Sequence, residues 1–257
     1  MSLIISIQSE LLKTKRTASF WFSIIGAAFI PMLLFIALFT DKDAHINLAK
    51  DPWGMFFRMG WQILTVFLLP LYIILVSTLI TQIEFKNNTW KQVHASPQSL
   101  GNIYFSKFLT IQLMILFCYV LFNIFMIASA LLGNFINAKY TFFDHSIDWK
   151  LLLKLNAGTY ISILGVSAIQ YWLSLRFKNF IAPVGIGLAM VIGSIIAMEY
   201  HWEHIYKFPY AFAILTFESI QEVNRPALEN HQLNSLGYFV FFLLVGFLDM
   251  KLRKEKG

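Results

Sequence analysis

Six stretches of mostly apolar residues limit what this chain can fold into more than any other feature of its sequence. A helix needs about 20 such residues to cross the hydrocarbon core of a bilayer, where its backbone must satisfy its own hydrogen bonds. The sequence therefore predicts an all-α integral membrane protein, with six transmembrane helices in a single domain that takes up residues 1–257. The stretches are residues 20–39, 61–83, 107–132, 151–175, 180–198 and 233–250.

The composition agrees with a location in lipid. Hydrophobic residues make up 58% of the chain and charged residues 13%, whereas soluble domains are about 45–50% apolar and about 25% charged. Cys118 is the one cysteine in the sequence, so the chain cannot form an intramolecular disulfide.

The charged residues are distributed unevenly between the two sets of connections. Residues 1–19, 84–107, 176–179 and 249–257 hold 12 basic and 4 acidic residues, and the opposite connections hold 7 basic and 10 acidic residues. Cytoplasmic loops are enriched in Lys and Arg, so the first set is predicted to be cytoplasmic, with both termini inside. The net charge of +6 then belongs to these loops and gives no reason to expect nucleic-acid binding.

Residues 2–15 are too polar to span a membrane but have an amphipathic pattern. Leu3, Ile4, Ile7 and Leu11 fall within one arc of a helix, and polar residues occupy much of the rest. A helix of this kind lies in the plane of the membrane–water interface. We predict such a helix here, with a frayed basic tail as the alternative.

Glu84 stands at the end of the second apolar stretch. A carboxylate at a helix C-terminus meets the negative end of the helix dipole, so a cationic partner would stabilise it. Lys13, Lys15 and Arg16 of the N-terminal segment lie at the matching depth. We predict an ion pair between Glu84 and one of these three residues, with a solvated Glu84 as the alternative.

The connection between the second and third spans is longer than a simple turn requires. It predicts a short helix over residues 89–95, capped by a preceding asparagine and ended by the Ser-Pro pair that follows. Trp90 and Val93 share one side of this helix, and Lys91 and His94 form a second face. Such a helix could dock a partner protein or pack only on lipid headgroups, and the sequence leaves both possibilities open.

Polar residues recur at helical spacing along the fourth span, with a weaker line on the third. Lines of this kind either face a wet pathway or hydrogen-bond to neighbouring helices, and both interpretations stand. The fourth-span line is Asn156, Thr159, Ser167, Gln170 and Ser174, and the third-span line is Gln112, Tyr119 and Asn123.

The fifth span carries a small residue at every fourth position, namely Gly185, Ala189, Gly193 and Ala197. Small residues at this spacing let another helix approach closely. The line predicts either a contact within the chain or a seam between two copies.

The sequence lacks the usual patterns of catalytic and nucleotide-binding sites. It has no G-x-x-x-x-G-K-[ST] phosphate loop, no H-E-x-x-H metal motif and no G-x-S-x-G nucleophile turn. His201, Glu203 and His204 are close in sequence, but no fourth ligand accompanies them, which favours structural or solvated histidines. We expect a non-catalytic chain without cofactor or metal, in which any use of ATP depends on another chain.

Two segments resemble the ABC-2 type permease family, especially the small permeases of bacterial exporters for lantibiotic immunity and bacitracin-like peptide resistance. They are SELLKTKRTASFW before the first span, and EFKNNTWKQVHASP followed by Lys107 between the second and third spans. The number of spans and the loop lengths are similar as well, so the resemblance covers nearly the whole chain.

The resemblance implies further structure and partners. Residues 2–15 would be an elbow helix, residues 88–96 a cytoplasmic coupling helix, and residues 199–232 would contain short re-entrant helices. A second copy, or a similar permease, would complete the translocation route in the bacterial cytoplasmic membrane. Two copies of a separate ABC ATPase, which holds ATP and Mg, would dock on Asn88, Thr89, Trp90, Lys91, Val93 and His94.

The implied function is that of an exporter permease for an amphipathic peptide, a lipid-linked molecule or a drug-like substrate. An ion-coupled carrier would require Asp or Glu near the middle of a span, and an intramembrane enzyme would require a cluster of reactive groups there. The sequence shows neither. A non-transporting membrane scaffold is the remaining alternative.

Overall fold

The computed structural model describes residues 2–40, 50–86, 98–220 and 228–252. Within these ranges, six helices are long and apolar enough to cross a membrane, and each corresponds to one predicted span. They are α2 (Ala18–Thr40), the continuous helix of α4 (Pro52–Ile63), η1 (Leu64–Leu68) and α5 (Leu69–Lys86), α7 (Leu100–Ile136), α8 (Trp149–Arg176), α9 (Ile181–Glu199) and α11 (Asn230–Leu252).

The helix of the second span begins earlier than the sequence analysis placed it. It starts at Pro52 rather than at residue 61, because the Asp51 side chain accepts a hydrogen bond from the Gly54 amide (2.9 Å) and proline suits a first helical turn. A five-residue π-helix, η1, interrupts it just before Pro70. Proline has no amide to donate and its ring crowds the carbonyl four residues earlier, which explains a wider turn at this point.

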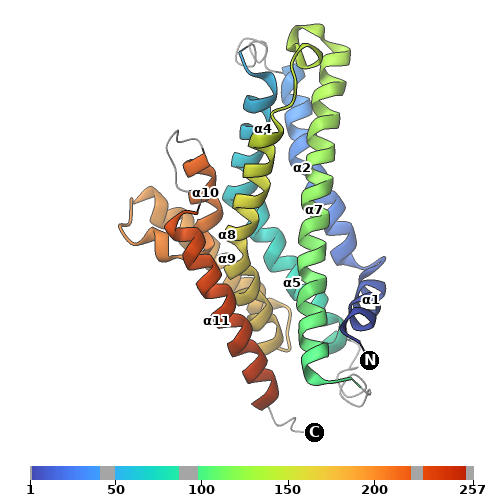
Figure 1. Cartoon of the computed structure of the whole chain (residues 1–257), viewed down its shortest axis with the longest axis vertical. Coiled ribbons are helices and arrows are strands. Elements are labelled where there is room, and N and C mark those ends of the chain that lie inside the picture. The colour runs from blue at the N-terminus through green and yellow to red at the C-terminus, as the bar shows by residue number, and fades with distance from the viewer. Residues whose placement is uncertain (1, 41–49, 87–97, 221–227, 253–257) are drawn as a thin grey trace.

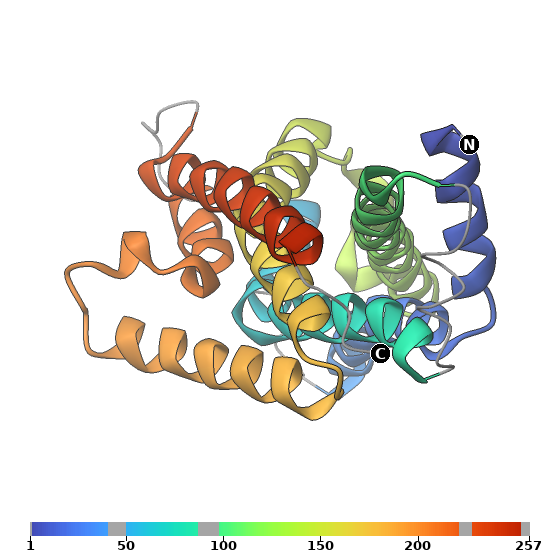
Figure 2. The ribbon, with the colours of Figure 1, turned by 90° about the horizontal axis from the view of Figure 1, so that it is seen from below.

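Helices α2, α7 and α8 run mainly along the length of the molecule, whereas α9 and α11 are tilted against it (Figure 1 and Figure 2). α8 packs against α5, α10 (Phe212–Ile220) and α11, while α7 packs against α2 and α1 (Leu3–Thr14). Large aromatic side chains fill the helix contacts, and Trp61 stacks on Tyr119 with ring centres 5.5 Å apart. Aromatic groups of this size bury much apolar surface and hold the bundle together.

The N-terminal helix α1 lies across the bundle instead of along it (Figure 2). Its buried side chains are the polar residues Ser6, Glu10 and Thr14, whereas Ile4 and Leu12 are 67% and 71% exposed. This is the reverse of an amphipathic helix on a soluble protein. It is expected of a helix that turns its apolar side chains toward lipid at a membrane interface.

At the end of the bundle opposite α1, two short helical turns follow α7. They are η2 (Ala138–Tyr140) and η3 (Phe142–Asp144). The Trp53 indole of α4 donates hydrogen bonds to the carbonyls of Phe142 and His145, both at 3.0 Å. These bonds fix the turns on the end of α4.

Three further short helices lie between α9 and α11 in the described part of that connection. They are η4 (Ile205–Lys207), η5 (Pro209–Ala211) and α10. With nine residues, α10 is too short to cross a bilayer. Residues 199–232 were predicted to contain short re-entrant helices; the short helices are present, and α10 packs against α8.

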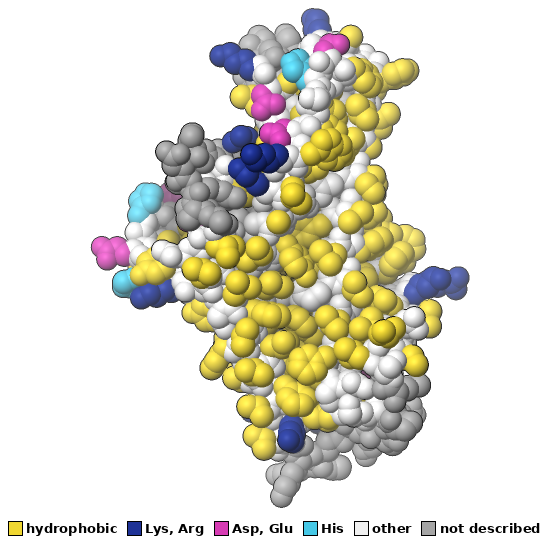
Figure 3. Space-filling view, viewed as in Figure 1, with side chains coloured by type: hydrophobic (Ala, Val, Ile, Leu, Met, Phe, Trp, Pro, Cys, Tyr) yellow, Lys and Arg dark blue, Asp and Glu magenta, His cyan; other side chains and the backbone are white. Residues whose placement is uncertain are grey.

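Hydrophobic side chains cover the middle of the face shown in Figure 3, and most charged side chains lie toward its ends and edges. Ile192 of α9 and Leu244 of α11 are 53% and 55% exposed. Exposed apolar surface of this extent is expected where spanning helices face lipid rather than water.

Candidate functional site

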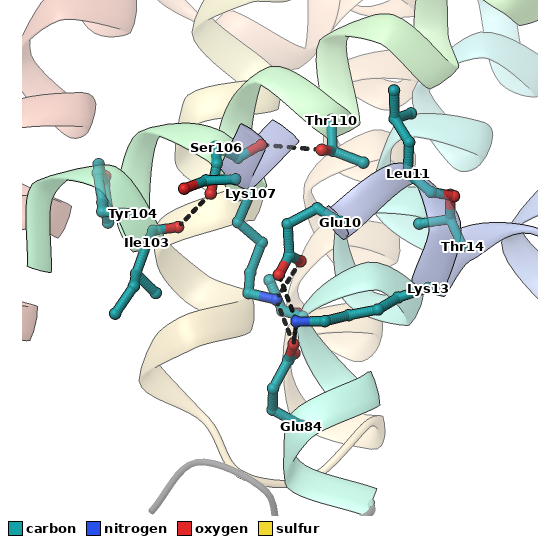
Figure 4. A network of polar contacts seen from close by, with 12 residues as sticks. Glu10, Leu11, Lys13, Thr14, Glu84, Ile103, Tyr104, Ser106, Lys107 and Thr110 are labelled. Atoms are coloured by element: carbon teal, nitrogen blue, oxygen red, sulfur yellow. Dashed lines mark hydrogen bonds and ion pairs between the residues drawn. The ribbon is translucent and has the colours of Figure 1, made fainter. Parts of the chain in front are cut away.

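Four charged side chains meet where α1 packs against the bundle (Figure 4). Lys107 of α7 lies between two carboxylates, with its Nζ 2.7 Å from Oε2 of Glu10 and 2.7 Å from Oε1 of Glu84. The Nζ of Lys13 is 2.5 Å from Oε1 of Glu10 and 3.1 Å from Oε1 of Glu84. Glu10 and Lys13 belong to α1 and Glu84 to α5, so this ion cluster joins three helices.

The ion cluster is buried most deeply on its α5 and α7 side. The side chains of Glu84 and Lys107 are each 1% exposed, that of Glu10 is 9% exposed and that of Lys13 is 35% exposed. Taking such charges out of water costs several kcal/mol per ion unless close opposite charges offset it. Each ammonium group reaches both carboxylates, and the two positive and two negative charges balance.

Contacts next to the ion cluster hold α1 in place. Ser6 and Glu10 are four residues apart and share the buried face of α1. The Ser6 hydroxyl donates a hydrogen bond to Oε1 of Gln98 (3.2 Å), and Ser99 caps α7 by accepting a bond from the Asn102 amide (3.2 Å). Helix α1 thereby contacts the chain on both sides of residues 87–97.

The same contacts set the ionisation of the two members on α1. Burial by itself would raise the pKa of the Glu10 carboxyl, but the ammonium groups of Lys107 and Lys13 outweigh it and hold this pKa below its ordinary value. Burial would lower the pKa of Lys13, but the carboxylates of Glu10 and Glu84 outweigh it and raise this pKa. Both groups are therefore charged at neutral pH.

The structure shows which of the three cations predicted as partners of Glu84 contacts it. Lys13 reaches Glu84, whereas Lys15 and Arg16 are exposed and make no ion pair within the described ranges. Arg16 has a positive φ of 66° and forms the turn from α1 into α2. The Arg16 side chain is exposed at this turn.

Sequence reasoning did not identify Glu10 and Lys107 as members of the ion cluster. A signal was present, because Lys107 stands at the start of an apolar stretch and a charge at that depth needs a partner. Its partner could not be identified from spacing, since Glu10 is 97 residues away in the sequence.

The predicted ATPase-docking residues lie outside the described part of the chain. The described segments end at Lys86 and resume at Gln98 on either side of them. The residues concerned are Asn88, Thr89, Trp90, Lys91, Val93 and His94.

The predicted polar line of the fourth span lies at the contacts of α8 with other elements. Every member of the line is hydrogen-bonded to a side chain from elsewhere in the chain, and the third-span residues Gln112 and Asn123 are among the partners. In this conformation the line bonds α8 to α5, α7 and η5. The pairs are Asn156 with Asn123 (2.8 Å), Thr159 with Tyr119 (3.2 Å), Ser167 with Gln112 (3.0 Å), Gln170 with Tyr210 (2.7 Å) and Ser174 with Thr78 (3.1 Å).

The small-residue line of α9 faces away from the rest of the described chain. No atom lies within 4 Å of the position that a Cβ would take at Gly185 or Gly193. A different glycine, Gly187, faces the bundle, and a Cβ there would lie 2.4 Å from Nε2 of Gln170. Of the two predicted roles for the line, a contact within the chain is therefore not made by Gly185 or Gly193 among the described residues.

His201, Glu203 and His204 are exposed and lie just after α9. Among the residues that the structure describes, no three His, Cys, Asp or Glu side chains are grouped so that they could hold a metal ion. The geometry gives this segment no ligand set.

Comparison with known proteins identifies a family for the chain. Residues 6–194 match the ABC-2 family transporter protein family, and no curated protein or solved structure gives a significant match. Members of this family are generally non-catalytic membrane transport components that work with ABC ATPases. The matched region contains all four members of the ion cluster. Because it covers more than half of the 257 residues, this chain is a multi-pass membrane component that belongs to the ABC-2 transporter family.

Proposed function

We propose that this chain is the transmembrane permease subunit of an ATP-driven exporter, and that a separate ABC ATPase docks at its cytoplasmic end. The observation that carries the proposal is the ion cluster, which joins α1 to α5 and α7. These two helices flank residues 87–97, which contain the predicted docking residues. A force applied to that segment would therefore reach three helices together.

The ion cluster suits the transmission of force because its members are buried. Removing one partner from a buried pair leaves an uncompensated charge, which costs about 3–5 kcal/mol. Sliding α7 past α5 would separate Lys107 from Glu84, whose charged atoms are 2.7 Å apart. The ends of these helices should therefore move as one body when the ATPase changes conformation.

The translocation route is proposed to lie between two permease copies. The polar line of α8 is hydrogen-bonded within the chain, which supports a route beside the bundle over a route through one copy. The outward line on α9, which includes Gly185 and Gly193, offers a second copy a surface for close approach. The pairs between α7 and α8 would line the route only in a conformation that opens their hydrogen bonds. The short helices between α9 and α11 would re-enter the bilayer at the outer end.

The chemistry of the bundle supports an exporter over an ion-coupled carrier. Among the described residues, the buried carboxylates are those of Glu10 and Glu84, and both are paired with lysines near α1. A carrier would place a carboxylate near the middle of a span. Neutral hydroxyl and amide groups suit an amphipathic peptide, a lipid-linked molecule or a drug-like substrate in the bacterial cytoplasmic membrane. Hydrolysis of ATP, with Mg, would take place in two partner ATPase subunits.

The test is affinity purification of the tagged chain from the membranes of the cells that encode it. A P-loop ATPase should co-purify in equal numbers, identified by mass spectrometry, and the complex should hydrolyse ATP. Trp90→Ala should weaken this association about thirtyfold, because a Trp hot spot contributes about 2 kcal/mol or more. Lys91→Ala serves as the matched control and should have a smaller effect, since charges at the rim of an interface mainly change association rates.

The two parts of the proposal can fail separately. Absence of any P-loop ATPase from the wild-type preparation would show that the chain is not an ATP-driven permease. An ATPase that binds Trp90→Ala as well as it binds Lys91→Ala would show that docking uses another surface.

A further inference from the structure

An apolar groove runs beneath α1, separate from the ion cluster. It has a volume of about 620 Å³ and is open to the outside over much of its extent. Leu11 and Leu12 of α1, Phe20 of α2, and Leu113 and Phe117 of α7 form most of its surface. Ligand pockets in proteins have volumes of about 300–1,000 Å³ and apolar linings with a few polar groups, so this groove has the dimensions and character of one.

The charged residue that lines the groove, within the described chain, is Lys15. Its neighbours on α1 direct their charges elsewhere, because Glu10 and Lys13 are held in the ion cluster. Arg16 follows at the turn into α2 and adds a second exposed cation close by. No carboxylate is among the described lining residues, so the mouth of the groove is electropositive.

The neighbouring helices support a position of the groove's mouth at the level of lipid headgroups. Helix α1 is too short to span a bilayer, carries exposed apolar side chains and packs beside the beginning of α7. Trp21, near the start of α2, is 54% exposed, and exposed tryptophans are enriched at membrane–water interfaces. An occupant of the groove would therefore have its polar end at the interface and its apolar part against α7.

We propose that this groove binds one anionic phospholipid, with an acyl chain on Leu113 and Phe117 and the headgroup phosphate at Lys15. The groove supplies both features that such a lipid recognises, which are an open apolar surface for an acyl chain and a cation for the headgroup. A free phosphate ion would use the cation and leave the apolar surface unfilled, so the lipid is the better match. The bound lipid would fix α1 against α2 and α7, whichever substrate the transporter carries.

The proposal is tested by native mass spectrometry of the detergent-purified chain, incubated separately with phosphatidylglycerol and with phosphatidylcholine. The wild type should retain one phosphatidylglycerol and prefer it to phosphatidylcholine about fivefold, which corresponds to about 1 kcal/mol for one lysine near a headgroup. Lys15→Gln should bring the ratio of the two lipids close to one. Lys178→Gln removes the same charge from an exposed site outside the groove and should leave the ratio unchanged.

Two further variants test the apolar part of the site. Leu113→Trp fills the groove and should abolish retention, whereas Ile124→Trp places the same side chain on an exposed position of α7 beyond the groove and should not. Equal retention by these two variants would overturn the proposed site, and the Lys15→Gln result decides the matter if Leu113→Trp does not fold. Equal retention of the two lipids by the wild type would refute the role of Lys15. Displacement of phosphatidylglycerol by inorganic phosphate alone would show an anion site instead of a lipid site.

Discussion

Replacement of Lys107 by methionine should destabilise the protein more than any loss of a surface charge. Lys107 is 1% exposed and contacts both Glu10 and Glu84 at 2.7 Å. Methionine keeps a similar length and removes the charge, so Lys107→Met leaves two buried carboxylates with Lys13 as their remaining cation. Lys13 is 35% exposed, and its attraction is screened by solvent more than that of Lys107.

The size of the effect follows from the burial of the carboxylates. Breaking a buried ion pair by removing one partner costs about 3–5 kcal/mol. In a domain of this size, each kcal/mol shifts the melting temperature by about 2–4 °C, which gives a predicted loss of about 6–20 °C. Lys178→Met is the matched control, because Lys178 is exposed and surface substitutions usually change stability by less than about 0.5 kcal/mol.

The assay is thermal unfolding of the purified chain in detergent, followed by tryptophan fluorescence. A second substitution, Glu84→Gln, should restore part of the lost stability in the Lys107→Met background, because it removes the carboxylate that was left unpaired. A Lys107→Met variant that melts within 2–3 °C of the wild type, about 1 kcal/mol by the same conversion, would refute the reasoning. The reasoning would also be refuted if Glu84→Gln lowered the stability of the Lys107→Met variant by as much as it lowers the stability of the wild type.

Four other predictions concern the ion cluster, helix α9 and the orientation. Folding lowers the pKa of Glu10, so ionised Glu10 stabilises the folded chain above the ordinary pKa of 4.5, and this stabilisation is lost as the pH falls below that value. A melting temperature that drops near neutral pH would contradict this. Gly187→Leu should lower the melting temperature by overpacking, because even a Cβ would lie 2.4 Å from a buried glutamine. Gly193→Leu has open space, so it should leave the melting temperature unchanged and should weaken any dimer seen by gel filtration. The predicted orientation can be tested with single cysteines in a Cys118→Ala background. Tyr200 is 81% exposed, and Tyr200→Cys should react with an impermeant thiol reagent in intact cells, whereas Lys178→Cys should not. The reverse pattern would invert the predicted orientation.

The number and position of the spanning helices could be predicted from the sequence because length and apolarity are local properties. A run of about 20 apolar residues satisfies the hydrocarbon core whatever its neighbours are. All six predicted spans correspond to long helices. The start at Pro52 was missed because a capped segment that includes Arg58 extends the helix beyond its most apolar part.

Which face of each helix is buried was decided by the tertiary structure. In water, burial follows apolarity, but apolar side chains are equally stable against lipid or against another helix. Helix α1 therefore buries Ser6 and Glu10 and exposes Leu12. Helix α9 has a glycine outside its small-residue line as well as within it, and packing alone places Gly187 inside and Gly193 outside.

The ion cluster shows the same division between sequence and structure. The sequence established that Glu84 needed a cation, because a carboxylate at a helix C-terminus opposes the dipole. It could not establish that Lys107 would lie between Glu84 and Glu10, because Lys107 and Glu10 are 97 residues apart in the sequence. Buried charges are satisfied by partners in space, and only the packing of α1 across α5 and α7 brings these groups together.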